Sequence, residues 1–221
     1  MTNFTKAELP PCSQKTITLA ITGASGIQYG LSLIQCLLEA HVVIHLLVSQ
    51  AALDVFSVEV DSSAPKSVDE LSAYLYQLHP NSEKLLFLYS DRQWTSLVAS
   101  GSGGPTSMVV CPCSAGTLSA IACGASNNLI ERAADVVLKE RRQLILVTRE
   151  MPLSSIHLEH MLKLSNMGVT IMPASPGFYN NPSSVQDMVD FVVARILDHL
   201  HVPHNLLQPW GVGMEGLLKV E

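Results

Sequence analysis

Six apolar runs of strand length recur along this chain, and segments with helical periodicity separate most of them. The runs lie at residues 16–22, 42–48, 84–88, 107–111, 143–148 and 169–172. Alternation of this kind predicts an α/β fold with a doubly wound, mainly parallel sheet and helices on both faces. Ligands of such sheets bind beyond the carboxyl ends of the strands, so the residues that follow each run are the candidate site.

The first apolar run is followed by a turn of small residues, Thr-Gly-Ala-Ser-Gly at 22–26, and then by a helix-like segment at 29–38. Backbone N–H groups at a helix N-terminus can hold a phosphate, and small side chains let such a ligand approach closely. The glycines lack the full dinucleotide-binding spacing, and no acidic residue ends the second run. A phosphate site and a plain tight turn therefore both remain open on this motif alone.

The composition favours one well-cored domain that binds small molecules. Of 221 residues, 48% are hydrophobic and only 14% are charged, which predicts a single domain. We expect this domain at 16–212, the range of the family resemblance given below, with a flexible segment at 1–15 and a tail at 213–221. A net charge of −6 without any Lys/Arg run argues against nucleic acid or an anionic membrane as partner. Low charge also predicts apolar surface buried between subunits, and hence a homo-oligomer.

Membrane, disulfide and metal chemistry are all disfavoured by the sequence. No apolar stretch reaches the roughly 20 residues of a membrane span, and the first fifteen residues lack a signal-peptide core. We therefore expect a cytoplasmic protein. The five cysteines mostly lie in apolar segments, which is typical of buried small side chains rather than disulfides. Neither the cysteines nor the clustered histidines have a matching ligand set, so we expect no metal site.

Four cations near predicted element ends are candidates for holding a phosphorylated ligand: Arg132, Lys139, Arg149 and Arg195. Ordinary surface ion pairing is the alternative for each. Glu59, in a mostly apolar segment, and Glu150, at the end of a strand-like run, are candidates for a general acid or base. Partial burial would raise a carboxyl pKa toward neutrality, whereas pairing with Arg149 or with solvent is the alternative.

Three further segments have a predicted structure. The stretch at 90–106 contains Trp94 and Ser-Gly-Ser-Gly-Gly at 100–104, which fits either an active-site lid or a plain solvated connection. Periodicity predicts a surface helix within 61–80 and a core-facing helix at 185–200, with Arg195 off the apolar stripe of the second helix.

Several motifs that occur in order resemble those of the flavin prenyltransferase (UbiX-type) family. They are Gly-Ala-Ser-Gly at 23–26, Cys-Pro-Cys-Ser at 111–114, Lys-Glu-Arg-Arg at 139–142, Arg-Glu-Met-Pro at 149–152, Lys-Leu-Ser-Asn at 163–166 and Pro-Gly-Phe-Tyr at 176–179. The resemblance covers about residues 16–212 and implies a flavodoxin-type or Rossmann-like flavoprotein domain assembled into a dodecamer. It implies transfer of the dimethylallyl group of dimethylallyl phosphate to N5 and C6 of reduced FMN without a metal. The product, prenylated FMN, would serve a UbiD-type decarboxylase.

The resemblance also implies roles for individual residues. FMN would be bound by Gly23, Ala24, Ser25, Ser49, Ser114, Ala115, Gly116, Thr117 and Arg149. Dimethylallyl phosphate would be bound by Arg132, Lys139, Tyr179 and Arg195, some of them from neighbouring subunits. Ser25 would lie near flavin N5, Glu59 would handle protons and Glu150 would protonate the departing phosphate. Trp94 or Trp210 would lie close to the prenyl group.

Two other functions fit the same architecture. A flavin-dependent cysteine decarboxylase needs an early catalytic histidine, but His41 and His45 are poorly placed, and residues 173–179 lack the Asn-Met signature of those enzymes. A non-enzymatic FMN carrier would not need Lys139, Tyr179 and Arg195 together.

Overall fold

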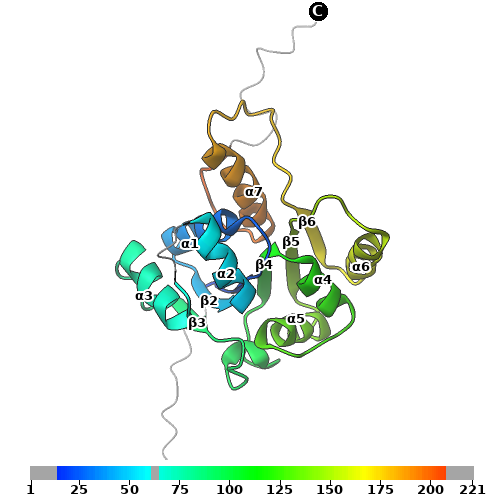
Figure 1. Ribbon diagram of the computed structural model, residues 1–221. Helices are drawn as coiled ribbons and strands as arrows, with labels where there is room; N and C mark the ends of the chain where they lie inside the picture. The colour runs from blue at the N-terminus through cyan, green and yellow to red at the C-terminus, as the bar shows by residue number, and fades with distance from the viewer. Residues whose placement is uncertain (1–13, 61–64, 208–221) are drawn as a thin grey trace, which may run out of the picture.

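The computed structural model describes residues 14–60 and 65–207, in which a parallel sheet lies between two layers of helices (Figure 1). All six apolar runs form strands, as the sequence predicts. The strands are β1 (Thr16–Ile21), β2 (Val43–Val48), β3 (Leu86–Tyr89), β4 (Ser107–Cys113), β5 (Gln143–Thr148) and β6 (Thr170–Pro173). Every neighbouring pair is parallel.

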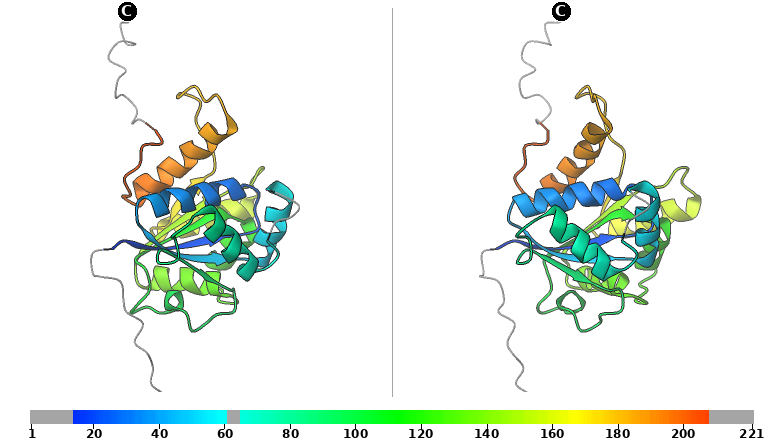
Figure 2. Two further views of the ribbon diagram at one scale, coloured as in Figure 1. Left: turned by 90° about the vertical axis from the view of Figure 1, so that its left-hand side faces the viewer. Right: turned by 60° about the vertical axis from the view of Figure 1, so that its left-hand side comes forward.

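Helices cover both faces of the sheet, which confirms the doubly wound class. They are α1 (Ile27–Glu39), α2 (Gln50–Glu59), α3 (Val68–Leu78), α4 (Ala115–Ala122), α5 (Leu129–Lys139), α6 (Ser155–Asn166) and α7 (Val185–His199), with a 3₁₀ turn, η1, at Leu97–Ala99. One core joins the sheet to α1, α2, α3 and α7, and the other joins it to α4, α5 and α6. Figure 2 shows α1 and α7 over one face and α5 beneath the other.

The strand order is β3-β2-β1-β4-β5-β6. β2 and β3 therefore follow one another outward on one side of β1, and β5 and β6 follow one another outward on the other side of β4. The connections that follow β1 and β4 leave toward opposite sides, which opens a crevice between the ends of these two central strands. Open α/β sheets bind their ligands at such a switch point.

The pleat of β1 explains how one short strand serves two cores. Ile17, Leu19 and Ile21 face the layer of α1 and α7, whereas Ala20 faces the layer of α4 and α5. Successive side chains of a strand point to opposite faces, so a strand covered on both sides reads as a nearly continuous apolar run.

The helix starts are set by side-chain caps. The hydroxyls of Ser49 and Ser114 accept backbone N–H groups at the starts of α2 and α4, and serine is a favoured residue at this position. Both helices start directly after strands, so their N-termini lie at the carboxyl edge of the sheet. This is the edge at which the site residues were expected.

The remaining fold predictions have mixed outcomes. The helix expected at 185–200 is α7, and the one expected within 61–80 is α3, although residues 61–64 lie outside the described part. Within the described ranges, no helix is both long and apolar enough to cross a membrane. The expected boundaries at 1–15 and 213–221 fall largely on residues outside the description and stay predictions.

Candidate functional site

The Thr22 side chain connects the turn after β1 to the turn after β4 by hydrogen bonds. The Thr22 hydroxyl donates to Pro112 O (2.8 Å) and accepts from the N–H of Ser114 (2.8 Å). The Thr22 N–H also donates to Pro112 O, at 3.2 Å. Thr22 is 1% exposed, so these bonds form away from water, where unmade bonds cost most. The sequence pattern gave Thr22 no role beyond the turn.

The start of α1 is held by a carboxylate from α2. Gly26, with φ 110°, precedes α1 and supplies no side-chain cap. Instead, Glu59 Oε2 accepts the N–H groups of Gly26 and Ile27, each at 3.0 Å. A negative group is favourable there because helix N–H groups and the helix dipole both point at it. Glu59 thus takes the N–H groups of Gly26 and Ile27, and the FMN roles of Gly23, Ala24 and Ser25 in the same turn stay predictions.

The environment of Glu59 changes our expectation for its acidity. Burial raises the pKa of Glu59, but hydrogen bonds from the Ser25 side chain and from the Gly26 and Ile27 backbone, together with the charge of Arg149, lower it. The net effect is a pKa below the ordinary glutamate value. The predicted rise toward neutrality is therefore wrong for this chain on its own, because hydrogen bonds to the charged form outweigh desolvation. Ser25, Glu59 and Arg149 do lie together.

Two glycines of the predicted FMN set have different surroundings. A Cβ at Gly23 would lie 2.5 Å from the Cβ of Ala51 in α2, so Gly23 allows α2 to pack on the turn. A Cβ at Gly116 would meet nothing closer than Ser114 Oγ at 4.0 Å. A side chain at Gly23 would therefore clash with α2, whereas the space beside Gly116 is open; the FMN roles of both glycines stay predictions.

The N-terminus of α4 has the features of an anion site. Ser114 Oγ accepts the N–H of Thr117 (3.2 Å) and donates to Thr117 Oγ1 (3.0 Å). Among the described residues, the N–H groups of Ala115 and Gly116 have no hydrogen-bond partner. These two donors, together with the open approach at Gly116, can take a phosphate.

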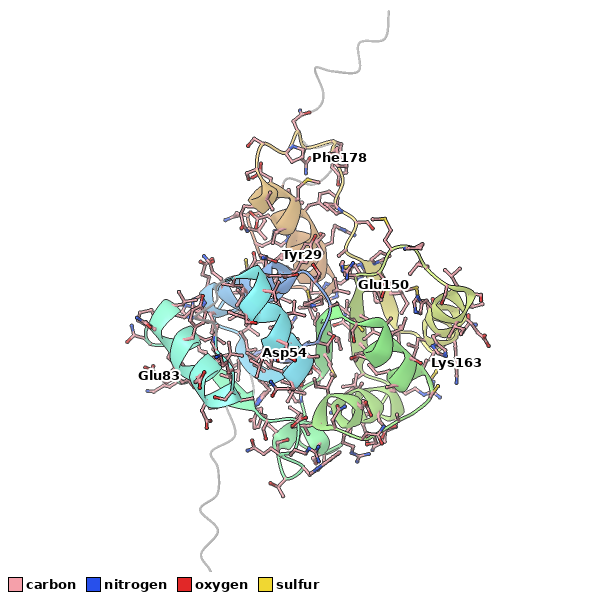
Figure 3. The ribbon with its side chains drawn as sticks, in the orientation of Figure 1. Tyr29, Asp54, Glu83, Glu150, Lys163 and Phe178 are labelled. Atoms are coloured by element: carbon pink, nitrogen blue, oxygen red, sulfur yellow. The ribbon has the colours of Figure 1, made fainter. Side chains whose placement is uncertain are left out.

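The end of β5 places Arg149 and Glu150 next to this crevice. The Nε of Arg149 is buried and has no hydrogen-bond partner in the described structure. Figure 3 labels Glu150 where β5 ends, with Phe178 far from it in the loop that leads to α7. Glu150 is exposed, so this chain alone does not provide the burial expected for it. A buried guanidinium N–H without an acceptor fits an anionic ligand.

Two more predicted residues lie at the same edge. Ser49 follows β2, and its hydroxyl accepts the N–H of Ala52 at 3.1 Å while its own N–H donates to Ile21 O. Tyr179 lies in the loop after β6, and its ring packs edge-on against Phe191 with centroids 5.5 Å apart.

The other three predicted phosphate cations form ion pairs with neighbouring carboxylates. Arg132 pairs with Asp135 (2.8 Å), Lys139 with Glu140 (2.5 Å) and Arg195 with Asp198 (2.6 Å), all partly exposed. This is the surface pairing that the sequence left open as the alternative. Their role toward dimethylallyl phosphate stays a prediction.

Lys139 and Arg195 also lie away from the crevice. Lys139 ends α5 just before β5 begins, and the last turn of α7 is held at the same edge by the Gln143 side chain, which donates to His199 O. This is the amino edge of the sheet, and a strand of six residues spans roughly 20 Å. Within one chain, these cations and Arg149 therefore cannot hold the same phosphate.

The glycine-rich loop is also at the amino edge. The guanidinium of Arg142 donates to the carbonyls of Gly101, Gly104 and Pro105. The loop therefore cannot cover the crevice of its own chain, and the lid interpretation is wrong for a single subunit. Trp94 is exposed in the segment after β3, and β3 is the outer strand on the opposite side of the sheet from β5 and β6. Trp210 lies outside the described residues.

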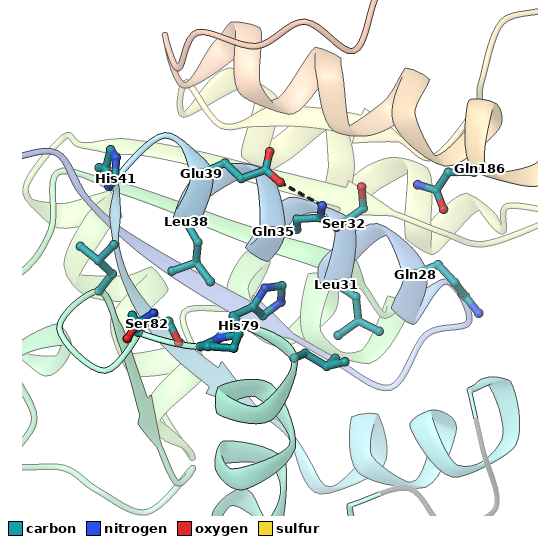
Figure 4. Close-up of a pocket in the computed structure, with 14 residues that line it drawn as sticks. Gln28, Leu31, Ser32, Gln35, Leu38, Glu39, His41, His79, Ser82 and Gln186 are labelled. Atoms are coloured by element: carbon teal, nitrogen blue, oxygen red, sulfur yellow. Dashed lines mark hydrogen bonds between the residues drawn. The ribbon is translucent and has the colours of Figure 1, made fainter.

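A separate hollow of about 840 Å³ runs along the outer face of α1 (Figure 4). Amides of Gln28, Gln35 and Gln186 line it, and Gln35 donates to Glu39 Oε1 at 2.9 Å. It contains no lysine, no arginine and none of the predicted site residues. This hollow lacks the positive charge that a phosphorylated ligand needs, so we do not assign the site to it.

Two further expectations from the sequence concern metal ligands and buried cysteines. In residues 14–60 and 65–207, no three His, Cys, Asp or Glu side chains come together as metal ligands. Burial raises the pKa of the Cys113 thiol to about 12, which keeps it protonated and unreactive. Cys12 is not among the described residues.

The doubly wound sheet, the helix N-termini at its switch point and the half-buried Arg149 fit a flavoprotein, and the sequence model of the Flavoprotein family matches residues 6–197. Within that class the chain belongs to the UbiX flavin prenyltransferases. It is 54% identical over 195 residues to the flavin prenyltransferase UbiX of Pseudomonas aeruginosa, an alignment that covers 88% of this chain and 93% of the relative.

Two solved structures support this placement. One is AnUbiX (PadA1) in complex with FMN and dimethylallyl pyrophosphate, with 34% identity, a TM-score of 0.79, and coverage of 89% of this chain and 97% of that chain. The other is a dodecameric FMN-dependent UbiX-like decarboxylase from Escherichia coli O157:H7, with 41% identity, a TM-score of 0.77, and coverage of 88% and 98%.

Proposed function

We propose that this protein is a flavin prenyltransferase that joins the dimethylallyl group of dimethylallyl phosphate to reduced FMN. The observation that carries the proposal lies beside the switch point: the α4 N-terminus and the unpartnered Arg149 Nε directly follow the paired ends of β4 and β5, where Cys113 lies opposite Thr148. The 54% identity to a flavin prenyltransferase supports the reaction. Reduced FMN would supply two nucleophilic atoms. N5 would bond to the allylic carbon as the C–O bond to phosphate breaks, and N5 would give up its proton. C6 would then bond to the far carbon of the prenyl double bond as that double bond takes up a proton and C6 loses its own.

The crevice residues fit a phosphorylated flavin. Ala115 and Gly116 offer two free N–H groups to its phosphate, and Arg149 offers a guanidinium N–H without an acceptor. Ser25 and Ser49 lie on the neighbouring strand ends, where a hydroxyl can orient the ring system. The FMN roles of these residues are part of the proposal.

The prenyl phosphate needs positive charge at the leaving group, because phosphate departs as an anion. Arg132, Lys139, Arg195 and Tyr179 are the groups that we propose for this task, in place of a metal ion. Glu150 is exposed at the end of β5, where it can reach a ligand and give a proton to the departing phosphate. Exclusion of water around the allylic carbon protects it from capture by solvent.

We infer that one pocket combines residues of several subunits. Lys139, Arg195 and the glycine-rich loop lie at the amino edge, whereas Ser25, Glu59 and Arg149 lie at the carboxyl edge. Both sets can meet only when the amino edge of one copy faces the carboxyl edge of another. A UbiX-like relative is dodecameric, which is consistent with a homo-oligomer here.

The test is the mass of the flavin recovered after anaerobic incubation of purified protein with reduced FMN and dimethylallyl phosphate. A gain of one C5 unit is expected. Unmodified FMN with bound donor would contradict the proposal and favour an FMN carrier. A parallel reaction with dimethylallyl diphosphate shows which donor this chain prefers, a question raised by the pyrophosphate bound to AnUbiX.

The proposed acid role of Glu150 has its own test. Glu150→Gln keeps the size of the side chain but removes the proton that the phosphate would receive. We expect prenyl transfer to slow by about a hundredfold, the lower range for general acid catalysis, with FMN affinity unchanged. Transfer at the wild-type rate in single-turnover measurements would exclude the role.

The proposal also includes the destination of the product. Prenylated FMN would be passed to a UbiD-type decarboxylase, and the reaction would take place in the cytoplasm. Accumulation of prenylated FMN on an apo decarboxylase mixed with this protein and its substrates would support the transfer. An apo decarboxylase that stays inactive in that mixture would contradict it.

A further inference from the structure

We infer that Thr22 is a positioning residue that holds the phosphate-binding end of α4 in register with the turn after β1. This inference rests on the proposed placement of the FMN phosphate at α4. The Thr22 hydroxyl is both donor and acceptor across the crevice, to Pro112 O and from the Ser114 N–H, each at 2.8 Å. The two bonded segments are about ninety residues apart in the sequence, and this hydroxyl connects them.

The bonds continue from Thr22 to the free donors of α4. Ser114, whose N–H is held by Thr22, caps the helix by accepting the Thr117 N–H. The unbonded N–H groups of Ala115 and Gly116 lie between these two anchored residues, so their direction follows from the position of Ser114. On the other side, Thr22 is followed directly by Gly23, against which Ala51 packs. The Thr22 N–H also bonds Pro112 O, so what the hydroxyl adds is the connection that reaches Ser114 and the start of α4.

The chemistry explains why a hydroxyl is needed here. Valine has the shape of threonine but can neither donate nor accept. In Thr22→Val the Ser114 N–H would lose its partner in a buried place, and the cap would move toward another acceptor. Serine keeps the hydroxyl, so Thr22→Ser keeps both bonds. Direct contact between Thr22 and the ligand is not required, because the effect passes through Ser114.

The experiment compares FMN with riboflavin, which lacks the phosphate, by fluorescence titration of the full-length apo protein. Loss of one well-placed hydrogen bond corresponds to about tenfold in affinity. We expect the dissociation constant for FMN to rise about that much in Thr22→Val, with that for riboflavin unchanged, and both to stay at wild-type values in Thr22→Ser. Thr18→Val, a buried threonine (2% exposed) earlier in β1, is the matched control and should affect neither.

The outcomes distinguish a wrong placement of the FMN phosphate at α4 from a wrong role for Thr22. A wild-type protein that binds FMN and riboflavin equally well overturns the phosphate placement at α4 and this inference with it. A wild-type preference for FMN that Thr22→Val retains in full overturns only the role of Thr22. Equal weakening of both ligands also overturns it, because that result indicates general loosening. If Thr22→Val does not fold, Thr22→Cys takes its place, since a thiol bonds weakly; a full wild-type preference in that variant contradicts the inference.

Discussion

Glu59 is the residue whose environment differs most from its sequence expectation. A carboxylate in an apolar segment suggested a group with a raised pKa. In the folded chain it accepts the first N–H groups of α1 and faces Ser25 and Arg149, which lower its pKa. A negative charge is thus stabilised beside the flavin position in the absence of ligand. Any proton handling by Glu59 must then depend on the bound substrates and the neighbouring subunits.

Glu59→Gln tests the stabilising part of this arrangement. An amide cannot supply a charge to the helix N-terminus, so we expect the free energy of unfolding to fall by about 0.5–1 kcal/mol at pH 7 after solvent screening. Because the folded pKa is below the ordinary 4.5, the advantage of wild type is present above that pH and disappears as the pH falls through the folded pKa. Urea unfolding at several pH values measures it. A loss that persists unchanged in strong acid would contradict the charge argument.

His45 also makes stability depend on pH, but here the group is a base whose neutral form is favoured in the folded chain. It is 6% exposed in β2, its Nδ1 lies 2.8 Å from the Tyr89 hydroxyl, and burial lowers its pKa from 6.5 to about 4. Between these values the unfolded chain binds a proton that the folded chain excludes, so stability is full above pH 6.5 and falls as the pH drops toward 4. We expect His45 to account for a loss of about 3 kcal/mol in unfolding free energy between neutral pH and pH 4.

Denaturant unfolding of His45→Gln and of the control His79→Gln measures this contribution. The first variant should lose the slope between pH 6.5 and 4 that the wild type shows, because glutamine does not titrate. The second should retain it. Identical slopes in all three proteins would show that His45 does not carry the effect.

At the scale of elements, the two central turns are similar in sequence but differ in what fills them. Both follow a central strand and both contain a glycine near a helix start. The turn after β1 is filled by Ala51 of α2 and by the Glu59 carboxylate. In the described residues, the turn after β4 is held by its own serine cap and by the Thr22 hydroxyl, and neither takes the N–H groups of Ala115 and Gly116. Access to backbone N–H groups therefore exists at α4, although the glycine pattern was more prominent at α1.

Alanine substitutions at Gly23 and Gly116 should separate the packing of α2 on the first turn from ligand access to the N–H groups of α4. Gly23→Ala places a methyl group 2.5 Å from Ala51 Cβ, so we expect a loss of about 1–3 kcal/mol in unfolding free energy. Gly116→Ala meets no such neighbour and should leave stability unchanged, while a methyl group at the open donors lowers FMN affinity. Thermal unfolding and FMN titration of both variants test this. Equal destabilisation by the two substitutions would contradict the difference in packing.

At the scale of the whole molecule, the sheet separates the proposed site residues into two groups at opposite edges. The cations Lys139 and Arg195 are paired with their own neighbours at the amino edge. Only an assembly brings them to Arg149 of another copy. The low charge of the chain already predicted a homo-oligomer, and the topology gives a reason for one.

Mixing two inactive variants tests the shared pocket. Lys139→Ala and Glu150→Gln each remove one residue of every site. If the two residues of a pocket come from different chains, random exchange of subunits restores about one quarter of the sites. We expect that fraction of wild-type prenyl transfer after co-refolding, whereas Glu150→Gln alone should retain only about a hundredth of it and Lys139→Ala alone should also stay far below one quarter. Absence of recovery in confirmed mixed oligomers would place both residues on one chain.

Sedimentation of the purified protein is the control for this experiment, because the mixture is informative only for an oligomer. A stable monomer with full activity would contradict the shared pocket directly. Co-refolding of each variant with itself controls for activity lost in the procedure.

The sequence alone predicted all six strands, the covering of both sheet faces, and the polar edge where Ser25, Ser49, Ser114 and Arg149 lie. These follow from local patterns, because apolar periodicity reports which faces of an element are buried. The resemblance in motifs predicted the family and its cofactor. It could not reveal Thr22 as the connection between two turns, Ala51 as the neighbour of Gly23, or Arg142 as the anchor of the glycine-rich loop.

Those three contacts, and the separation of the cations from the crevice, were decided by the tertiary structure. Each joins segments far apart in the chain, so no local pattern encodes which partner is reached. A carboxylate such as Glu59 can bind a helix N-terminus, an arginine or a ligand, and only the packing of α2 against the start of α1 selects among them. The sequence determined which elements form and which chemistry is present, whereas the strand order determined which of those groups meet.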